Sequence, residues 1–195
     1  ESLYVFCRYL DDLGDDLNLN KSDSFKKLKI IKKEILKKKS TFPAVSNFIG
    51  LMIKHKINKS IPLELINGIE CDLKEQVNIE TFEQLIKYCY QVAGTVGFMF
   101  CKIIKVKDKK LILGGIQLGI AMQLTNISRD VSEDLEMNRI YIPKSMRSYK
   151  NNDRETILGN KSIKEKLSKD LLVLLKKADL FYENAWISIN LLKKK

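Results

Sequence analysis

The sequence predicts an all-α helical bundle, and three observations lead to this prediction. Apolar residues recur at helical spacing along most of the chain, and no run shows the alternation of a half-buried strand. Only three prolines and nine glycines interrupt the 195 residues. Hydrophobic residues make up 45% of the chain, which favours a folded core over disorder. A chain of this length is expected to form a single domain over residues 1–195.

The boundaries of the helices follow from caps and breakers. Pro43 and Pro62 each fit the first turn of a helix, where the missing N–H has no partner to lose. Asn78 is the expected N-cap of the helix that follows it, and Pro143 ends the longest apolar region. The predicted helices cover residues 2–16, 24–39, 43–55, 62–76, 79–102, 107–137 and 162–192, with a polar turn at 18–22 and a loop with short turns over 145–160.

The net charge of +11 raises the alternative of a basic nucleic-acid-binding protein. The lysines are scattered over every predicted helix, however, and are not interleaved with aromatic residues as a base-stacking surface requires. The pattern favours lysines that solvate the outer helix faces and no nucleic-acid partner. Such lysines are also expected to meet anionic headgroups, so the protein is expected to contact membranes only peripherally. A salt-dependent affinity for DNA without binding of Mg²⁺ and diphosphate would favour the alternative.

Cysteine usage and hydropathy favour a cytoplasmic protein that contacts at most the inner membrane face. Four cysteines stand singly within helical patterns, which is typical of reduced core thiols. These are Cys7, Cys71, Cys89 and Cys101. The single histidine, His55, excludes His-rich metal sites. The longest apolar run, residues 111–124, is broken by glutamines and is too short to span a bilayer; the chain opens in an amphipathic pattern rather than a secretory leader.

A polar stripe interrupts the apolar 107–137 helix near its end. The stripe consists of Gln123, Asn126, Asp130 and Asp134. At about 100° per residue, its members fall within a sector of roughly 80°. Gly119 lies one turn earlier on the same side, where it is expected to leave room for a ligand, and Arg129 flanks the stripe. Because the rest of this helix is apolar, the carboxylates are expected to point into the protein.

The first helix carries a second stripe within a sector of roughly 60°. It consists of Tyr4, Arg8, Asp11 and Asp15. For a single D-x-x-x-D pair, a solvated acidic face is the competing interpretation. Two such pairs, each with an arginine within a turn, weaken it, because like charges repel unless a cation neutralises them. Hard oxygen ligands on two facing helices fit Mg²⁺ shared with substrate phosphates, with Mn²⁺ as the alternative ion, and the arginines complete a diphosphate clamp.

A third stretch, residues 88–100, places small residues inside a helix, where glycine lowers stability. The small residues are Ala93, Gly94 and Gly97. One interpretation is close packing against another helix. The other is a helix that opens to make room for a long apolar substrate, with Val92, Val96 and Met99 as its wall. Both interpretations stay open.

Together the three stretches resemble the squalene/phytoene synthase family, the head-to-head prenyltransferases. FCRYLDDLGDD resembles the first aspartate motif of the family, YCYQVAGTVG its central pocket motif, and GIAMQLTNISRDVSEDLEMNRIYIP its second aspartate motif. VAGTVG and RIYIP are most similar to the phytoene synthase branch. The resemblance implies an isoprenoid-synthase-type helical bundle with a central cavity. Family members have further helices at both ends, so the chain is expected to be part of a longer protein.

The resemblance also implies residue roles. Asp11 and Asp15 would bind Mg²⁺ at one diphosphate, with Asn126, Asp130 and Asp134 at the other. Both Asp pairs, Arg8 and Tyr88 would be catalytic. The residues implied to contact phosphate or orient the reacting groups are Tyr4, Arg8, Gln123, Arg129, Arg139 and Tyr141, and those implied to line the central cavity are Tyr88, Val92, Ala93, Val96 and Gly97.

The implied reaction joins two geranylgeranyl diphosphates through a cyclopropyl diphosphate to phytoene, in carotenoid biosynthesis, with Mg²⁺ and without NADPH. Squalene or dehydrosqualene synthase, acting on two farnesyl diphosphates, is the alternative because it shares every motif. A non-catalytic scaffold is disfavoured by the intact acidic motifs. The oligomeric state is not predicted.

Overall fold

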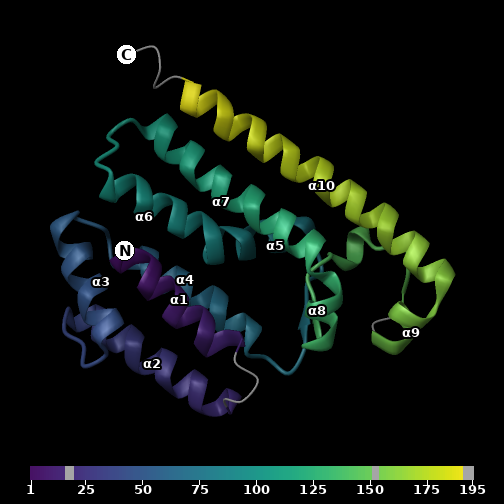
Figure 1. The fold of residues 1–195 in the computed structure, drawn as a ribbon, viewed down its shortest axis with the longest axis horizontal. Helices are drawn as coiled ribbons and strands as arrows, with labels where there is room; N and C mark the ends of the chain where they lie inside the picture. The colour runs from purple at the N-terminus through teal and green to yellow at the C-terminus, as the bar shows by residue number, and fades with distance from the viewer. Residues whose placement is uncertain (16–19, 151–153, 191–195) are drawn as a thin grey trace.

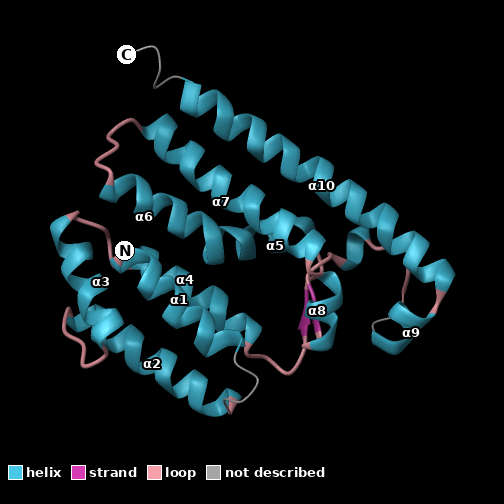
Figure 2. Ribbon diagram, in the orientation of Figure 1, coloured by secondary structure: helices cyan, strands magenta, loops and turns pink. Residues whose placement is uncertain are grey.

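The computed structural model describes residues 1–15, 20–150 and 154–190, and this part of the chain is almost entirely helical (Figure 2). The α-helices are α1 (Ser2–Asp15), α2 (Lys21–Lys37), α3 (Pro43–Lys54), α4 (Ser60–Asp72), α5 (Phe82–Cys89), α6 (Thr95–Ile103), α7 (Lys109–Arg129), α8 (Val131–Glu136), α9 (Arg154–Gly159) and α10 (Lys161–Asn190). A π-helical turn, η1 (Tyr90–Gly94), joins α5 to α6, and a 3-10 turn, η2 (Lys144–Met146), precedes α9. The all-α prediction is confirmed.

The helices form two groups that meet along α6 (Figure 1). In the first group, α1 to α4 bury Phe6, Ile31 and Phe48, and Met99 of α6 joins this core. In the second, α7 lies between α6 and α10, and α5 contributes to their shared core. The short helices α8 and α9 cover one end of this second group (Figure 1). All the helices that carry the predicted motifs therefore lie at or beside the junction of the two groups.

The predicted helix 79–102 begins later than expected. Residues 77–78 form strand β1 (Val77–Asn78), which pairs in parallel with β2 (Arg139–Ile140). Thr81, not Asn78, is the N-cap of α5, because its side chain accepts a hydrogen bond from the Gln84 N–H at 3.3 Å. The expectation for Asn78 was wrong, since its backbone is committed to the strand pair.

The predicted helix 107–137 is two helices. Asp130, with φ −98° and ψ 16°, leaves the helical range and separates α7 from α8. The predicted loop over 145–160 contains η2 and α9. Several predicted positions lie outside the described residues: position 16, residues 18–19 of the predicted turn, residues 151–153 and the end of the last helix at 191–192. The rest of the predicted 18–22 turn was wrong, because Asn20 caps α2, which begins at Lys21 and not at 24.

Two glycines of the predicted motifs allow α7 to approach its neighbour closely. A Cβ on Gly97 would lie 2.1 Å from the Gly115 carbonyl oxygen, and one on Gly119 would lie 2.4 Å from the Ala93 carbonyl oxygen. Close packing is therefore the correct interpretation of Gly97. The expectation that Gly119 leaves room for a ligand was wrong, because the backbone of Ala93 fills that space.

By length and composition, α7 is the one helix in the described ranges that is apolar enough to cross a membrane. It lies between α6 and α10 and also contacts α5 and η1, and 28% of its most apolar stretch is buried. All four cysteines carry free thiols; Cys89 and Cys101 are buried, whereas Cys7 and Cys71 are half-buried.

Candidate active site

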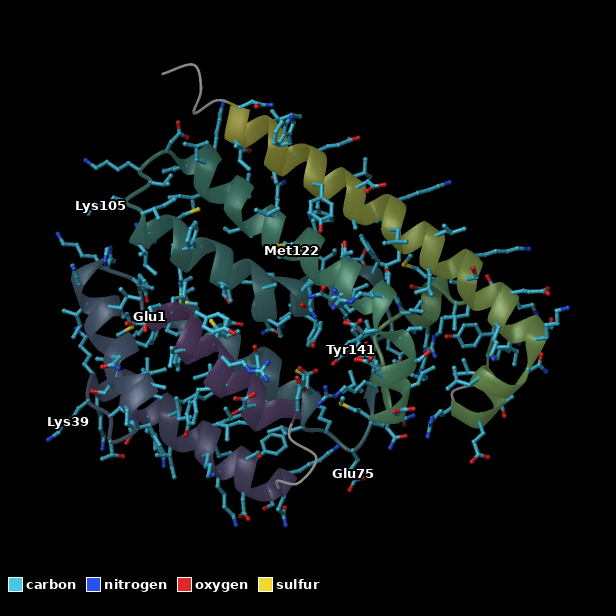
Figure 3. The ribbon with its side chains drawn as sticks, in the orientation of Figure 1. Glu1, Lys39, Glu75, Lys105, Met122 and Tyr141 are labelled. Carbon is cyan, nitrogen blue, oxygen red and sulfur yellow. The ribbon has the colours of Figure 1, made fainter. Side chains whose placement is uncertain are left out.

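A cavity of about 290 Å³ lies where the C-terminal ends of α1, α4 and α7 meet α5, α8 and β2. The lining residues are Asp11, Gly14, Asp15, Ile69, Asp72, Tyr88, Val92, Gln123, Asn126, Ile127, Asp130, Asp134, Arg139 and Tyr141. Both acidic stripes predicted from the sequence reach this cavity, from helices far apart in the chain. Figure 3 shows polar side chains from several elements gathered beside the labelled Tyr141.

The first acidic pair stands at the end of α1. Leu10 and Leu13 bury the opposite face of this helix in the core, which turns Asp11 and Asp15 towards the cavity. The pKa of Asp11 is raised to about 6, chiefly because the surrounding chain excludes water and secondarily because Asp15 carries a like charge one turn away. A cation at the cavity would relieve both effects.

Arg139 connects this pair to the β2 strand. Its Nη1–H donates to Asp15 Oδ1 at 2.7 Å, and its Nη2–H donates to the Gly14 carbonyl oxygen at 2.8 Å. The side chain is only 8% exposed, and its buried Nε–H has no hydrogen-bond partner among the residues that the structure describes. An unpartnered buried donor is unfavourable unless a ligand or water supplies an acceptor. Arg139 therefore fits a site that binds an anion.

The second acidic stripe faces the same cavity on both sides of the break between α7 and α8. The Asp130 N–H donates to the Asn126 carbonyl oxygen at 2.8 Å, and the Asp134 N–H donates to the Asp130 carbonyl oxygen at 2.9 Å. The two carboxylates differ in charge environment. Arg129 donates to both oxygens of Asp130, at 2.6 and 2.7 Å, and lowers the pKa of that carboxyl. Burial raises the pKa of Asp134 to about 7, although the charge of Arg139 opposes this.

Asp72 is a site residue that the sequence analysis missed. Its carboxylate is buried and accepts hydrogen bonds from Tyr141 at 2.7 Å and from Tyr88 at 3.0 Å. The two tyrosine rings stack with centroids 4.8 Å apart. Burial raises the pKa of Asp72 to about 6 against the opposing effect of these hydrogen bonds. The sequence could have indicated this residue. Asp72 follows Leu65 and Ile69 at helical spacing on the buried face of α4, and a buried carboxylate is unfavourable without a hydrogen-bond partner.

Three residues that were expected to contact phosphate or orient the reacting groups do not line the cavity. Tyr4 is 72% exposed, and Arg8 forms an exposed ion pair with Asp12 at 2.9 Å. Both share the stripe of Asp11, but the cavity lies beside only the last turns of α1, so the first turns extend past it. Arg129 is held at the rim by Asp130 and is mostly exposed.

Two of the five residues implied to line the central cavity do so, namely Tyr88 and Val92, whereas Ala93, Val96 and Gly97 do not. Met99, expected in the apolar wall, is buried in the core of the first group instead. The backbones of Ala93 and Gly97 contact α7 instead, and Val96 lies against the core of α1 to α4.

The carboxylates of the cavity fit Mg²⁺ only if substrate phosphates and water complete its coordination. Among the described residues, no three acidic, histidine or cysteine side chains converge closely enough to hold a metal ion alone. Mg²⁺ is commonly held by one or two carboxylates, water and substrate phosphates. Two acidic pairs on facing walls, with the raised pKa values of Asp11 and Asp134, match that arrangement.

Comparison with known sequences identifies a family. The family model described as squalene/phytoene synthase matches residues 2–195. The 15-cis-phytoene synthase of Enterobacter agglomerans is 30% identical over 193 residues, covering 94% of this chain and 65% of that protein. The chloroplastic phytoene synthase 1 of Arabidopsis thaliana is 27% identical over 192 residues, covering 94% of this chain and 45% of that protein. The chain thus spans about half to two thirds of the length of these relatives.

Comparison with solved structures gives the same fold. A dehydrosqualene synthase crystallised in complex with ligand has a TM-score of 0.74 and 27% identity, covering 97% of this chain and 66% of that one. The squalene synthase HpnC from Alicyclobacillus acidocaldarius has a TM-score of 0.64 at 20% identity, a likeness in fold alone, and covers 99% of this chain and 81% of that one. The predicted isoprenoid-synthase-type bundle is confirmed. Since the family model matches almost every residue, the chain belongs to the squalene/phytoene synthase family.

Proposed function

We propose that the complete protein is a phytoene synthase, a prenyltransferase that joins two geranylgeranyl diphosphates head to head with Mg²⁺ and without NADPH. The observation that carries the proposal is the meeting of two acidic pairs, from α1 and from α7–α8, at one cavity beside the buried Arg139. One diphosphate would be held against Asp11 and Asp15, and the other against Asn126, Asp130 and Asp134.

The charges of this site suit the departure of diphosphate. Bound Mg²⁺ would supply positive charge to the leaving group. The unpartnered Nε–H of Arg139 offers one more donor. Arg129 is held by Asp130 at the rim, and an entering diphosphate would compete with that carboxylate for its guanidinium fork.

The other side of the cavity suits the carbocation that remains. Tyr88 and Tyr141 present stacked rings, whose π faces attract cations. Asp72 fixes both hydroxyl groups, so the rings are held in place before substrate arrives. Ile69, Val92 and Ile127 contribute apolar surface to the same wall, which helps to keep water from the reactive carbons.

The choice of the C20 substrate rests on similarity. The relatives reported above from Enterobacter agglomerans and Arabidopsis thaliana are named phytoene synthases. Gly97 does not bear on the choice, because it contacts α7 and does not line the cavity. The alternative is squalene or dehydrosqualene synthesis from farnesyl diphosphate, which the fold shared with a dehydrosqualene synthase favours.

The test offers the complete protein geranylgeranyl or farnesyl diphosphate, each with Mg²⁺ or EDTA and with or without NADPH, and identifies the hydrocarbon formed. Phytoene that requires Mg²⁺ and ignores NADPH is expected. Squalene formed only from farnesyl diphosphate with NADPH would overturn the proposal, and dehydrosqualene without NADPH would overturn the chain length.

Paired variants connect the activity to this cavity. Asp134→Asn should lower turnover by at least about 100-fold, because it removes a metal-binding charge. Glu133→Gln is the matched control, since its carboxylate is exposed on the neighbouring position of α8. Equal activity of the two variants would count against the assignment of the site.

A further inference from the structure

The end of the bundle farthest from the acidic cavity carries a basic hollow. The hollow, of about 510 Å³, is lined by Lys54, His55, Lys56, Lys102, Lys105, Val106 and Lys107. It lies between the C-terminal end of α3 and the turn that joins α6 to α7. Within the described ranges, none of its lysines forms an ion pair with a carboxylate.

The two segments that form this hollow carry few acidic residues. No acidic residue occurs between Glu34 and Glu64, and Asp108 is the only one between Glu83 and Asp130. Asp108 serves the fold, because its side chain accepts a hydrogen bond from the Lys110 N–H at 2.8 Å and caps α7. Several lysines of the sequence are thus brought together here, with Asp108 as the one acidic residue of the two segments that form the hollow.

Two lysines of the hollow occupy backbone positions that favour glycine. Lys56 and Lys105 follow α3 and α6 with φ of 52° and 62°, in the left-handed region. Glycine or asparagine is the usual residue there, because a side chain such as lysine is strained. Lys38, with φ of 55°, ends α2 in the same way beside Lys39, which Figure 3 shows on the same side of the molecule as Lys105.

Exposed apolar side chains occur on the same helix ends that carry the basic hollow, at or near the C-terminal ends of α3 and α6 and in the second turn of α7. Each exposes more than half of its surface: Ile53 53%, Phe100 55%, Ile104 56% and Leu113 52%. Lysines reach anionic headgroups with their amines while exposed aliphatic and aromatic groups enter the acyl boundary, so this mixture fits a membrane interface. A nucleic acid would use the lysines but leave the apolar groups without a partner.

We infer that this end of the bundle, defined by the basic hollow and the four exposed apolar residues on the same helix ends, is a docking surface for an anionic lipid membrane. Helix α7 runs from this surface at Lys109 to the acidic cavity near Arg129, about 30 Å at 1.5 Å per residue. Docking would therefore place the acidic cavity several screening lengths from the negative lipid surface. Figure 3 shows Lys105 and Tyr141, the labelled residues of the two sites, well apart along the bundle.

The inference goes beyond the proposed function and is tested without turnover, so either can fail alone. The complete protein is mixed with vesicles of phosphatidylcholine, or of phosphatidylcholine with phosphatidylglycerol, and the sedimenting fraction is measured. We expect binding to the anionic vesicles that weakens as salt rises. Replacing Lys54, Lys56, Lys105 and Lys107 by Gln should lower the partition coefficient by at least about tenfold.

A matched control removes the same charge elsewhere. Lys164, Lys166, Lys169 and Lys176 are exposed on α10, and their replacement by Gln should leave vesicle binding within about twofold of the wild type, since they lie far from the surface. Equal loss in both quadruple variants would overturn the inference in favour of a net-charge effect. Absence of binding by the wild type at low salt would overturn it outright.

The apolar contribution has its own pair of variants. Ile104→Ser should weaken binding by about tenfold, whereas Leu172→Ser, equally exposed on α10 at 57%, should not. If the quadruple lysine variant folds poorly, Lys105→Asn replaces it, because asparagine tolerates the left-handed backbone. Loss of RNA binding in these lysine variants, with vesicle binding unchanged, would overturn the inference and assign the surface to nucleic acid.

Discussion

Asp134→Asn should make the metal-free protein more stable at pH 8. Burial raises the pKa of this carboxyl to about 7, from an ordinary value of 3.8. The folded state therefore holds the proton more tightly than the unfolded state does, and stability falls as pH rises from about 4 towards 7. Above that range the full cost of the buried carboxylate is present. Asparagine has the same shape without the charge, so it removes the cost.

The magnitude follows from the pKa. A carboxyl that titrates near 7 in the folded protein lowers stability at pH 8 by at most about 4 kcal/mol. Local relaxation and solvent at the cavity reduce this to about 1–2 kcal/mol. For a chain of this size, that gain raises the melting temperature by about 2–8 °C. At pH 4.5 the wild-type carboxyl is largely protonated when folded, so most of the difference should vanish.

The assay is thermal unfolding of the complete protein in EDTA, from pH 4.5 to 8, followed by circular dichroism. Glu133→Gln is the control, because its side chain is exposed and its removal should leave the melting temperature within about 1 °C. Adding Mg²⁺ with diphosphate should stabilise the wild type more than Asp134→Asn. A variant that melts below the wild type at pH 8, or a gain that is the same at pH 4.5, would refute the reasoning.

Three further predictions concern residues that hold the site together. Arg139→Gln should lower the free energy of unfolding by about 2–4 kcal/mol in urea titrations, because Asp15 and the Gly14 carbonyl lose a buried partner. The control Arg154→Gln breaks only an exposed ion pair and should change the free energy of unfolding by less than about 0.5 kcal/mol. Gly97→Ala should destabilise by about 1–3 kcal/mol, because the new Cβ would meet the Gly115 carbonyl oxygen, whereas Gly50→Ala in α3 meets open space and should be neutral or stabilising. Asp72→Asn should lower turnover at least about tenfold with a small change in melting temperature, since one tyrosine hydroxyl loses its acceptor; unchanged turnover would remove this network from the mechanism.

The two acidic stripes could be predicted because helical geometry is local. Spacings of three and four residues fix which side chains share a face, and the apolar residues of the same helix show which face is buried. This put Asp11, Asp15, Asp130 and Asp134 at one cavity, as the structure has them. The same geometry placed Tyr4 on the stripe but gave no information on where along α1 the cavity ends, because that depends on α4 and α7.

The features that escaped prediction all depend on contacts between distant segments. Asn78 is drawn into a strand by Ile140, more than sixty residues away, and Gly119 is filled by the backbone of Ala93. Asp72 gains its role from tyrosines on α5 and beyond β2. From local sequence alone, Asn78 fits an N-cap, Gly119 fits a gap beside a ligand, and Asp72 fits the exposed end of a helix. Tertiary contacts decide their actual roles.

The acidic cavity has the opposite charge to the protein as a whole. Aspartates from three segments, Asp11 and Asp15, Asp72, and Asp130 and Asp134, surround a cavity in which Arg139 is the buried cation. The protein as a whole carries a charge of +11, so its outer field attracts anionic diphosphates and lipids, while the cavity alone would repel them. If a diphosphate binds there as proposed, it should do so only with cations that neutralise the carboxylates. Diphosphate binding should therefore be strongly coupled to Mg²⁺, and each should raise the affinity for the other by the same factor.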